Sequence, residues 1–395
     1  MSRFLPDGIA ALLVAALLTG GGGAQTADAA FRRLDGTHIS TAEIDASVIR
    51  AMRAARVTGA AIAMLQDGEV VYQKAYGWRD VEKKLPLTDN SVMTAASLSK
   101  SAFAVVVMQL AASGTLNLDA PVSRYLREPL SEFPGYTDLA GDPRCEKITA
   151  RMLLSHTSGF PNWRRFEPDG KLRIHFQPGS RFAYSGEGFR LLQHVVEAAT
   201  RRPFADLMAE REFRPLGMTR TSMTWTRFFE DDFSNAYDAQ GNSLGPQRRT
   251  KPDAAGGMQT TVADYARLLS SLLQGRAMIP SARNEMLSPQ IRIHSRHEFP
   301  SLEAQTTEEN DAIRLSYGLG WGLYWTPFGQ AFFKEGHDEG WRHYAVCFTE
   351  ARSGLLIMTN SSNGEAIYAE LIEKLLGNRF TPLEWEGFAP PQAKL

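Results

Sequence analysis

The stretch that decides the fold lies at residues 94–110 and reads TAASLSKSAFAVVVMQL. Its second half, Ala102–Leu110, is apolar on every side, a pattern typical of a helix buried all round rather than of an amphipathic surface helix. Gly114 supplies a stop shortly after it. Ser97 and Lys100 stand at the start of this helix, so a hydroxyl and an amine are placed at the entrance to the core.

The Ser-x-x-Lys spacing of these two residues points to nucleophilic chemistry. Residues i and i+3 share one face of a helix, so the Ser97 hydroxyl and the Lys100 amine can meet. A serine hydroxyl needs a base to attack at neutral pH, and a lysine in apolar surroundings has a lowered pKa and can be that base. The helix N-terminus also presents N–H groups where an oxyanion forms. The spacing alone equally fits an N-capping serine followed by a surface lysine.

Strands are predicted near both ends of the chain and helices between them. The turn Asp67-Gly68 is a hairpin signal between two apolar runs. The predicted strands are 60–65, 70–75, 318–324, 330–334, 343–349 and 355–359; the predicted helices include 42–57, 189–199, 261–273 and 366–376. This order predicts an α+β fold, with an antiparallel sheet built from both termini, flanked by helices, and an inserted, mostly helical region over roughly 120–255.

Five further short segments follow one another along the chain after Ser97. They are Leu153–Gly159 (LLSHTSG), Tyr184-Ser185-Gly186, Pro215–Met218 (PLGM), Gly256-Gly257-Met258 and His337-Asp338-Glu339. Together with the Ser97 segment they resemble, from about residue 42 to 376, the superfamily of class C serine β-lactamases, penicillin-binding proteins and family VIII esterases. The resemblance implies the β-lactamase/transpeptidase-like version of the α+β fold.

The resemblance also implies roles for individual residues. Ser97 is expected to attack a carbonyl and become acylated, and Lys100 to hold or take its proton. Tyr184 is expected to act as a second general acid or base, its phenol pKa lowered by the nearby ammonium. His337 is expected on a strand opposite Ser97, in the place of the family's third motif, which is Lys-Thr-Gly or His-x-Gly.

The backbone just beyond that motif is expected to complete an oxyanion hole with the Ser97 amide, through an N–H near Glu339 or Gly340. Trp163 and Trp341 are expected to wall the acyl pocket, although core packing accounts for either equally well. His156 is expected to be a hydrogen-bonding loop residue.

Two departures from the family pattern bear on the substrate. Gly186 stands where the second motif has an asparagine, and Asp338 and Glu339 stand in the third motif. Two carboxylates there repel the carboxylate of a penicillin or a peptidoglycan stem, which favours a neutral or amine-bearing substrate. If the motif is shifted or shortened instead, these carboxylates point away and are solvated.

The leading hypothesis is therefore a serine hydrolase that acts on a small ester, amide or peptide through an acyl-enzyme. Alternatives on the same fold are a penicillin-binding protein, a D-aminopeptidase, a weak β-lactamase and a non-catalytic binding module. An α/β-hydrolase is indicated only by the G-x-S-x-G spacing at 241–245, whose flanks are typical of an exposed turn around Ser243.

Composition limits the kinds of partner and cofactor that can be expected. The 395 residues carry a formal net charge of −1, which gives no indication of a nucleic-acid or anionic-membrane partner. No cofactor and no metal is expected, because the proposed mechanism requires neither. His294 and His297 have a spacing that could ligate a metal, but no third ligand is evident nearby. Two cysteines, Cys145 and Cys347, exclude a disulfide scaffold but leave their pairing open, as the sequence leaves the oligomeric state.

Residues 1–29 resemble an export signal: Arg3 precedes an apolar run at 9–18, and Ala27-Asp28-Ala29 offers a small-residue cleavage site. The hydrolase domain is then 30–395. The expected location is periplasmic or secreted, with no stable membrane insertion after cleavage.

Overall fold

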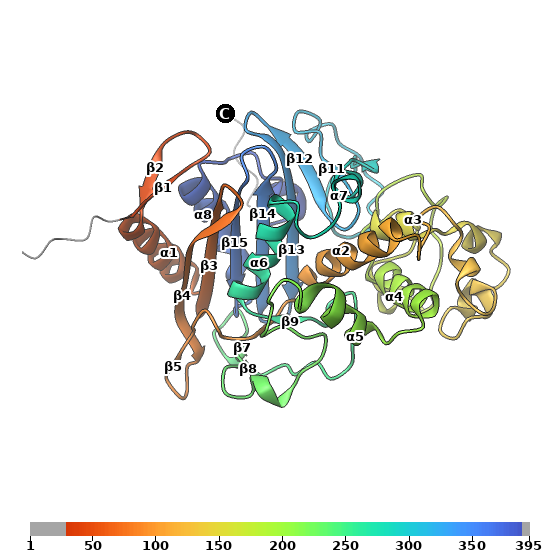
Figure 1. The fold of residues 1–395 in the computed structure, drawn as a ribbon, viewed down its shortest axis with the longest axis horizontal. Coiled ribbons are helices and arrows are strands. Elements are labelled where there is room, and N and C mark those ends of the chain that lie inside the picture. The colour runs from red at the N-terminus through yellow and green to blue at the C-terminus, as the bar shows by residue number, and fades with distance from the viewer. Residues whose placement is uncertain (1–28, 389–395) are drawn as a thin grey trace, which may run out of the picture.

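A nine-stranded antiparallel sheet forms the centre of the computed structural model, which describes residues 29–388 (Figure 1). Its strands follow the order β10-β11-β12-β13-β14-β15-β3-β4-β5. Their bounds are β10 Ile291–Arg292, β11 Ser316–Tyr317, β12 Gly322–Thr326, β13 Gly329–Asp338, β14 Trp341–Phe348, β15 Ser353–Thr359, β3 Gly59–Gln66, β4 Glu69–Asp80 and β5 Leu85–Pro86. Short pairs outside it are β1 Ala30–Arg32 with β2 His38–Ser40, β6 Met93–Thr94 with β9 Gln259–Thr260, and β7 Ala236–Tyr237 with β8 Ser243–Gly245.

The sheet joins the two ends of the chain, as predicted. Strand β3 pairs with β15 in a register that sets Ile62 opposite Ile357. The hairpin from β3 to β4 turns at Asp67 and Gly68, whose φ angles of 51° and 83° are those of a two-residue turn that matches the twist of the strands. The α+β architecture predicted from the sequence is thereby confirmed.

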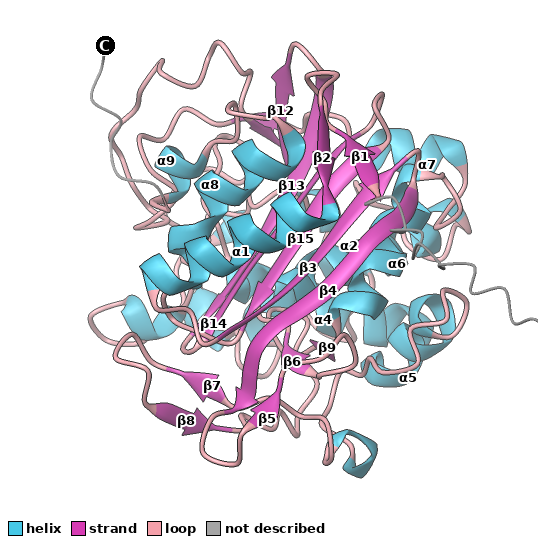
Figure 2. Cartoon of the chain, turned by 90° about the vertical axis from the view of Figure 1, so that its left-hand side faces the viewer, coloured by secondary structure: helices cyan, strands magenta, loops and turns pink. Residues whose placement is uncertain are grey.

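Helices cover both faces of the sheet (Figure 2). The helices are α1 Thr41–Ala55, α2 Leu98–Ala112, α3 Ala150–Leu154, α4 Gly186–Thr200, α5 Phe204–Met208, α6 Val262–Leu273, α7 Pro280–Met286, α8 Tyr368–Leu371 and α9 Leu383–Glu386. Helices α1 and α8 pack on one face, and α2 and α6 on the other. Successive strand residues point to opposite faces of the sheet. Ala61 therefore packs in the hydrophobic core between the sheet and α2, called the α2-side core, and Ile62 in the core between the sheet and α1, called the α1-side core. A strand buried on both faces explains the continuous apolar run of β3.

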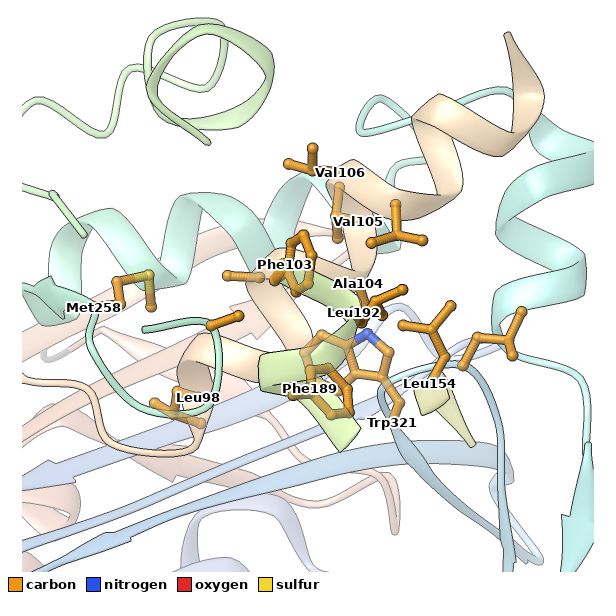
Figure 3. Packing of buried hydrophobic residues seen from close by; sticks show 14 of the residues in the cluster. Leu98, Phe103, Ala104, Val105, Val106, Leu154, Phe189, Leu192, Met258 and Trp321 are labelled. Atoms are coloured by element: carbon orange, nitrogen blue, oxygen red, sulfur yellow. The ribbon is translucent and has the colours of Figure 1, made fainter. Parts of the chain in front are cut away.

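Helix α2 runs through the α2-side core, which explains its apolar sequence (Figure 3). Phe103, fully buried, meets the rings of Phe189 and Phe204 edge-on at centroid distances of 6.4 and 4.9 Å. Helix α6 begins where predicted, because the Thr261 hydroxyl accepts a hydrogen bond from the amide of Asp264 at 3.1 Å.

The region 120–255 contributes no strand to the nine-stranded sheet. It supplies α3, α4, α5 and the β7–β8 hairpin, so it is the predicted helical insertion. Cys145 and Cys347 are buried and unpaired. The predicted export signal falls, up to residue 28, outside the described residues and stays a prediction. Among the helices of the described part, none has the length and apolarity needed to cross a membrane.

Candidate active site

The Ser97 hydroxyl is positioned by a sharp turn at the start of α2. Ala96 adopts a φ of 47°, which non-glycine residues rarely do, and α2 begins directly after Ser97. The turn is anchored because the Ala95 amide donates to the Met258 carbonyl at 2.8 Å. Within the described residues the Ser97 amide has no acceptor, which leaves this N–H available to a ligand.

Lys100 lies one helical turn further, completely buried. Its Nζ is 2.9 Å from the Ser97 Oγ and donates to the Ala255 carbonyl at 2.6 Å. Burial is the main cause that lowers the pKa of Lys100 to about 7, and the positive charge of Lys334 adds to it. The amine and hydroxyl thus meet as the Ser-x-x-Lys spacing indicated, and the surface-lysine alternative is wrong.

Tyr184 comes from the segment that leads into α4. Ser185 caps this helix by accepting from the Gly188 amide at 2.9 Å, which fixes the preceding tyrosine. The His156 ring stacks on Tyr184 at 4.3 Å, while its Nδ1 accepts from the Ser185 amide at 3.0 Å. His156 is therefore a hydrogen-bonding loop residue, as expected, and it orients the phenol.

The expected direction of the Tyr184 pKa shift was wrong. Burial raises the pKa of the Tyr184 phenol well above its usual value, and the charge of Glu335 adds to the rise. The neighbouring Ser97 hydroxyl acts in the opposite direction but is a smaller cause. Tyr184 is consequently a protonated phenol, able to donate a proton rather than to take one.

Lys334 is the site residue that the sequence reasoning missed. Its fully buried Nζ donates to the Tyr184 hydroxyl oxygen at 2.9 Å and pairs with the Glu335 carboxylate. With Gly336 it forms a Lys-x-Gly sequence three residues upstream of His337. Because the third motif can read Lys-Thr-Gly, the Lys-x-Gly pattern was the sequence signal that could have identified Lys334.

The alternation of β13 explains why His337 is not beside Ser97. Phe332 points into the α2-side core and Phe333 into the α1-side core, so even-numbered residues face α2. A side chain at Gly336 would meet the Ala95 carbonyl at 2.8 Å, which places this backbone next to the Ser97 turn. The His337 ring faces the other way and stacks on Phe388 at 6.0 Å. Only the backbone of His337 is oriented toward the site.

The residues after His337 form the turn into β14 rather than an oxyanion hole. The Glu339 amide donates to Asp338 Oδ1 at 2.9 Å, and the Gly340 amide donates to the Ser362 hydroxyl at 3.0 Å. Both of these N–H groups are therefore occupied, which contradicts the expectation for them. Trp341 is fully buried in the α2-side core, with its indole N–H on Gln247, so it packs the core and does not wall a pocket.

A cavity of about 820 Å³ opens over Ser97. Trp163 lines it, as predicted, and so does Asp338. Asp338 is paired with the Arg249 guanidinium, so its negative charge is compensated. The expected wall of two repelling carboxylates is thus wrong: Asp338 is neutralised, and Glu339 lies exposed outside the cavity lining.

Trp163 explains the missing asparagine of the second motif. A Cβ atom built on Gly186 would lie 2.3 Å from the Trp163 ring, closer than any real contact. Gly186 therefore makes room for the indole, and the indole occupies the direction in which a side chain at residue 186 would extend. At this wall the cavity has an aromatic face in place of an amide.

Three buried glutamates lie behind Lys334. The carboxylates of Glu298, Glu335 and Glu386 lie within 4.8 Å of one another, a spacing that could hold a metal ion. Burial raises the pKa of Glu298 and of Glu386 well above the usual value, and the charge of Glu335 adds to both rises. The two are accordingly neutral acids, and Glu335 is the counter-ion of Lys334. The set was invisible in the sequence because its members come from distant segments.

The remaining sequence signals lie away from the cavity. Ser243 is exposed at the start of β8, within the β7–β8 hairpin, and residues 246–253 after it form no helix, so the α/β-hydrolase alternative has no structural support. His294 and His297 each lie near one carboxylate, of Asp311 and Glu303, with half-exposed side chains.

Comparisons with known proteins agree with this geometry. The model of the family described as "Beta-lactamase" matches residues 44–376. Esterase EstB of Burkholderia gladioli is 32% identical over 203 residues, which cover 45% of this chain and 50% of the esterase. Protein flp of Staphylococcus aureus NCTC 8325 is 26% identical over 222 residues, which cover 52% and 43% of the two chains. The chain thus spans about half the length of the curated relatives it matches.

Solved structures share the fold. The octameric penicillin-binding protein homologue from Pyrococcus abyssi superposes with a TM-score of 0.69 at 22% identity, over 88% of this chain and 79% of its own. EstCE1, described as a hydrolase with promiscuous acyltransferase activity, gives 0.69 at 19% identity, over 85% and 97%. At these identities the likeness concerns the fold.

Gly186→Ala is expected to destabilise the protein by about 1–3 kcal/mol, because the methyl group overlaps the Trp163 ring. Urea denaturation measures the loss. Gly188→Ala is the matched control on the same helix, since its Cβ would lie 3.4 Å from the nearest atom. In Gly186→Ala combined with Trp163→Ala, the two effects should be strongly non-additive. Equal losses in the Gly186 and Gly188 variants would contradict the packing argument.

Proposed function

The chain belongs to the beta-lactamase family, and from that premise we propose that it is a serine hydrolase that cleaves a small ester or amide through an acyl-enzyme on Ser97. The family expected from the ordered motifs is confirmed, and the esterase among its relatives supports a hydrolase. The nucleophile and the reaction are the proposed part.

One observation carries the proposal: the buried Lys100 amine lies 2.9 Å from the Ser97 hydroxyl. With its pKa lowered to about 7, Lys100 is neutral in a large fraction of molecules near neutral pH. The neutral amine keeps its contact with the Ala255 carbonyl and presents its lone pair to Ser97. It takes the hydroxyl proton as the Ser97 oxygen attacks the carbonyl carbon of the substrate.

The oxyanion formed in this attack needs two donors. The free Ser97 amide is one of them. We assign the second to the His337 amide, because Gly336 lies against the Ala95 carbonyl and β12 pairs with β13 only as far as Phe333. His337 thus contributes its backbone, and its imidazole faces the other side of the sheet.

Tyr184 is the proton donor to the leaving group. Its phenol stays protonated, and the Lys334 ammonium holds its oxygen at 2.9 Å. The tetrahedral intermediate collapses when the bond to the leaving oxygen or nitrogen breaks and the phenol proton passes to that atom. The proton held on Lys100 then passes to the Tyr184 phenolate, whose ring centroid lies 5.1 Å from the Lys100 Nζ. A water molecule takes the place of the leaving group and hydrolyses the acyl-enzyme by the same proton transfers in reverse.

An ester is the better substrate candidate than a β-lactam. The aromatic wall of Trp163 and Gly186 provides no side-chain amide to bond an acylamino group. The relative EstB is named an esterase, and its similarity to this chain over half of its length supports this preference. The following experiment tests this proposal against three alternatives, which are penicillin binding, D-aminopeptidase activity and a non-catalytic binding module.

Labelling with a fluorophosphonate, followed by peptide mapping, is expected to give one adduct, on Ser97. Ser97→Ala should abolish both the adduct and the hydrolysis of short 4-nitrophenyl esters, while its circular dichroism stays that of the wild type. Lys100→Met should reduce turnover about as completely, because the two side chains act as one unit. An adduct on Ser243, or an unlabelled but folded protein, would refute the assignment.

Lys334 and His337 can be separated by substitution. Lys334→Met is expected to lower kcat for ester hydrolysis by about 100-fold or more, since it removes the cation that holds Tyr184. His337→Gln should retain activity within about threefold, because its ring faces away from Ser97. The reverse order of the two effects would restore His337 as the third catalytic side chain.

The pH profile should show the titration of Lys100. Its base form is the deprotonated amine, so kcat/KM is expected to rise about tenfold per pH unit below about 7 and to level off above it. Tyr184 contributes no limb in this range, because its pKa is raised. Steady-state rates with a 4-nitrophenyl ester, corrected for spontaneous hydrolysis, measure the profile. A rate independent of pH between about 5 and 8 would contradict a neutral-amine base.

A further inference from the structure

The cavity over Ser97 has a strongly positive lining, although the chain as a whole has a net charge of −1. Six cationic side chains line it against three carboxylates. The cations are Arg164, Arg165, Arg190, Arg248, Arg249 and Lys251, and the carboxylates are Glu187, Asp253 and Asp338. A concave site with one dominant sign of charge concentrates ligands of the opposite sign.

Internal ion pairs account for only part of this charge. Each carboxylate in the lining forms an ion pair with one arginine of the lining. The pairs are Glu187 with Arg164 at 2.9 Å, Asp253 with Arg190 at 2.7 Å, and Asp338 with Arg249. Arg248 is paired with Glu230, which lies outside the lining.

Two cations remain. Neither Arg165 nor Lys251 forms an ion pair or a hydrogen bond with any part of the chain that the structure describes. Both side chains are exposed. Their charge is therefore available to a ligand in the cavity.

Arg165 is held in place without losing its hydrogen-bond donors. Its guanidinium lies 4.9 Å from the ring centroid of Trp163 and 4.9 Å from that of Phe166. Stacking on aromatic rings uses the face of the guanidinium and leaves the N–H groups at its edge free. Such a fork suits the two oxygens of a carboxylate.

Trp163 links this cation to the reacting group. The same indole that carries Arg165 lies 5.9 Å, by its ring centroid, from the Lys100 Nζ. A substrate whose carbonyl lies at Ser97 can thus extend along the cavity, past the indole, toward Arg165. The room for that indole exists because residue 186 is glycine.

We propose that Arg165 and Lys251 form an anion-binding subsite, which selects esters or amides that carry a carboxylate a few bonds from the reacting carbonyl. This inference rests on the proposed function, whose substrate class it specifies. It replaces the preference for neutral or amine-bearing substrates, because the carboxylate of Asp338 on which that preference was based is compensated by Arg249.

The experiment compares matched esters. 4-Nitrophenyl hemiglutarate is set against its neutral methyl ester, and 4-acetoxybenzoate against 4-acetoxybenzamide, so that the carboxylate lies on the acyl part in one pair and on the alcohol part in the other. For at least one pair, kcat/KM is expected to favour the carboxylate by about tenfold or more, and the preference should shrink as salt is raised. Equal rates for both pairs, or a preference for the neutral partner, overturn the proposal.

Substitution assigns the effect to the subsite. Arg165→Gln combined with Lys251→Gln is expected to lower the carboxylate-to-neutral ratio by about 10- to 100-fold. Arg53→Gln is the matched control, because Arg53 is an exposed arginine of α1, on the opposite face of the sheet. A ratio that survives the double substitution overturns the role of these residues.

A binding measurement separates this inference from the proposed reaction. In Ser97→Ala, calorimetric titration with glutarate should show binding that glutaramide lacks and that the double substitution removes. If no ester is hydrolysed but glutarate still binds in this way, the reaction is wrong and the subsite stands. If esters are hydrolysed but glutarate binding is absent or unchanged by the double substitution, the subsite is wrong and the reaction stands.

Discussion

The burial of Lys100 without a carboxylate partner is the constraint on which the site depends. A charged ammonium in such surroundings is costly, so the protein favours the neutral amine. The rings of Trp163, Tyr184 and Phe189 lie within 6 Å of its Nζ, and the Ala255 carbonyl accepts one of its hydrogens. Lys334, equally buried, has the Glu335 carboxylate beside it. The two buried lysines thus differ in their surroundings, because Lys100 lies among aromatic rings without a carboxylate partner and Lys334 is paired with one.

The sequence predicted the elements whose signals are local. The Asp67-Gly68 turn, the Thr261 cap and the apolar surface of α2 each depend on a few neighbouring residues, and each formed where expected. Ser97 and Lys100 belong to this class too, since one helical turn brings them together. The fold and the contact between these two side chains could therefore be inferred without coordinates.

The rest of the site depends on which face of a strand a residue occupies. His337 and Lys334 lie on the same strand, and both fit a version of the third motif. Only the register of β13 against its neighbours decides that Lys334 faces Tyr184, a residue 150 positions earlier in the chain. The fit of Trp163 over Gly186, the Asp338–Arg249 pair and the three buried glutamates are likewise contacts between distant segments. A net charge near zero also gave no sign of a positive cavity, because composition does not record where charges gather.

The pairing of β3 with β15 has a consequence for how the chain matures. During synthesis the hairpin of β3 and β4 emerges long before Ser353–Thr359 exists, so one edge of a strand that is apolar up to its last residue has no partner until the ribosome has nearly finished. Contacts across nearly 300 residues close the sheet late, and topologies of this kind fold slowly. The nascent protein therefore has an unpaired strand edge, to which other strands can bind, through most of its synthesis. This edge is paired only when the last strand, β15, has been made.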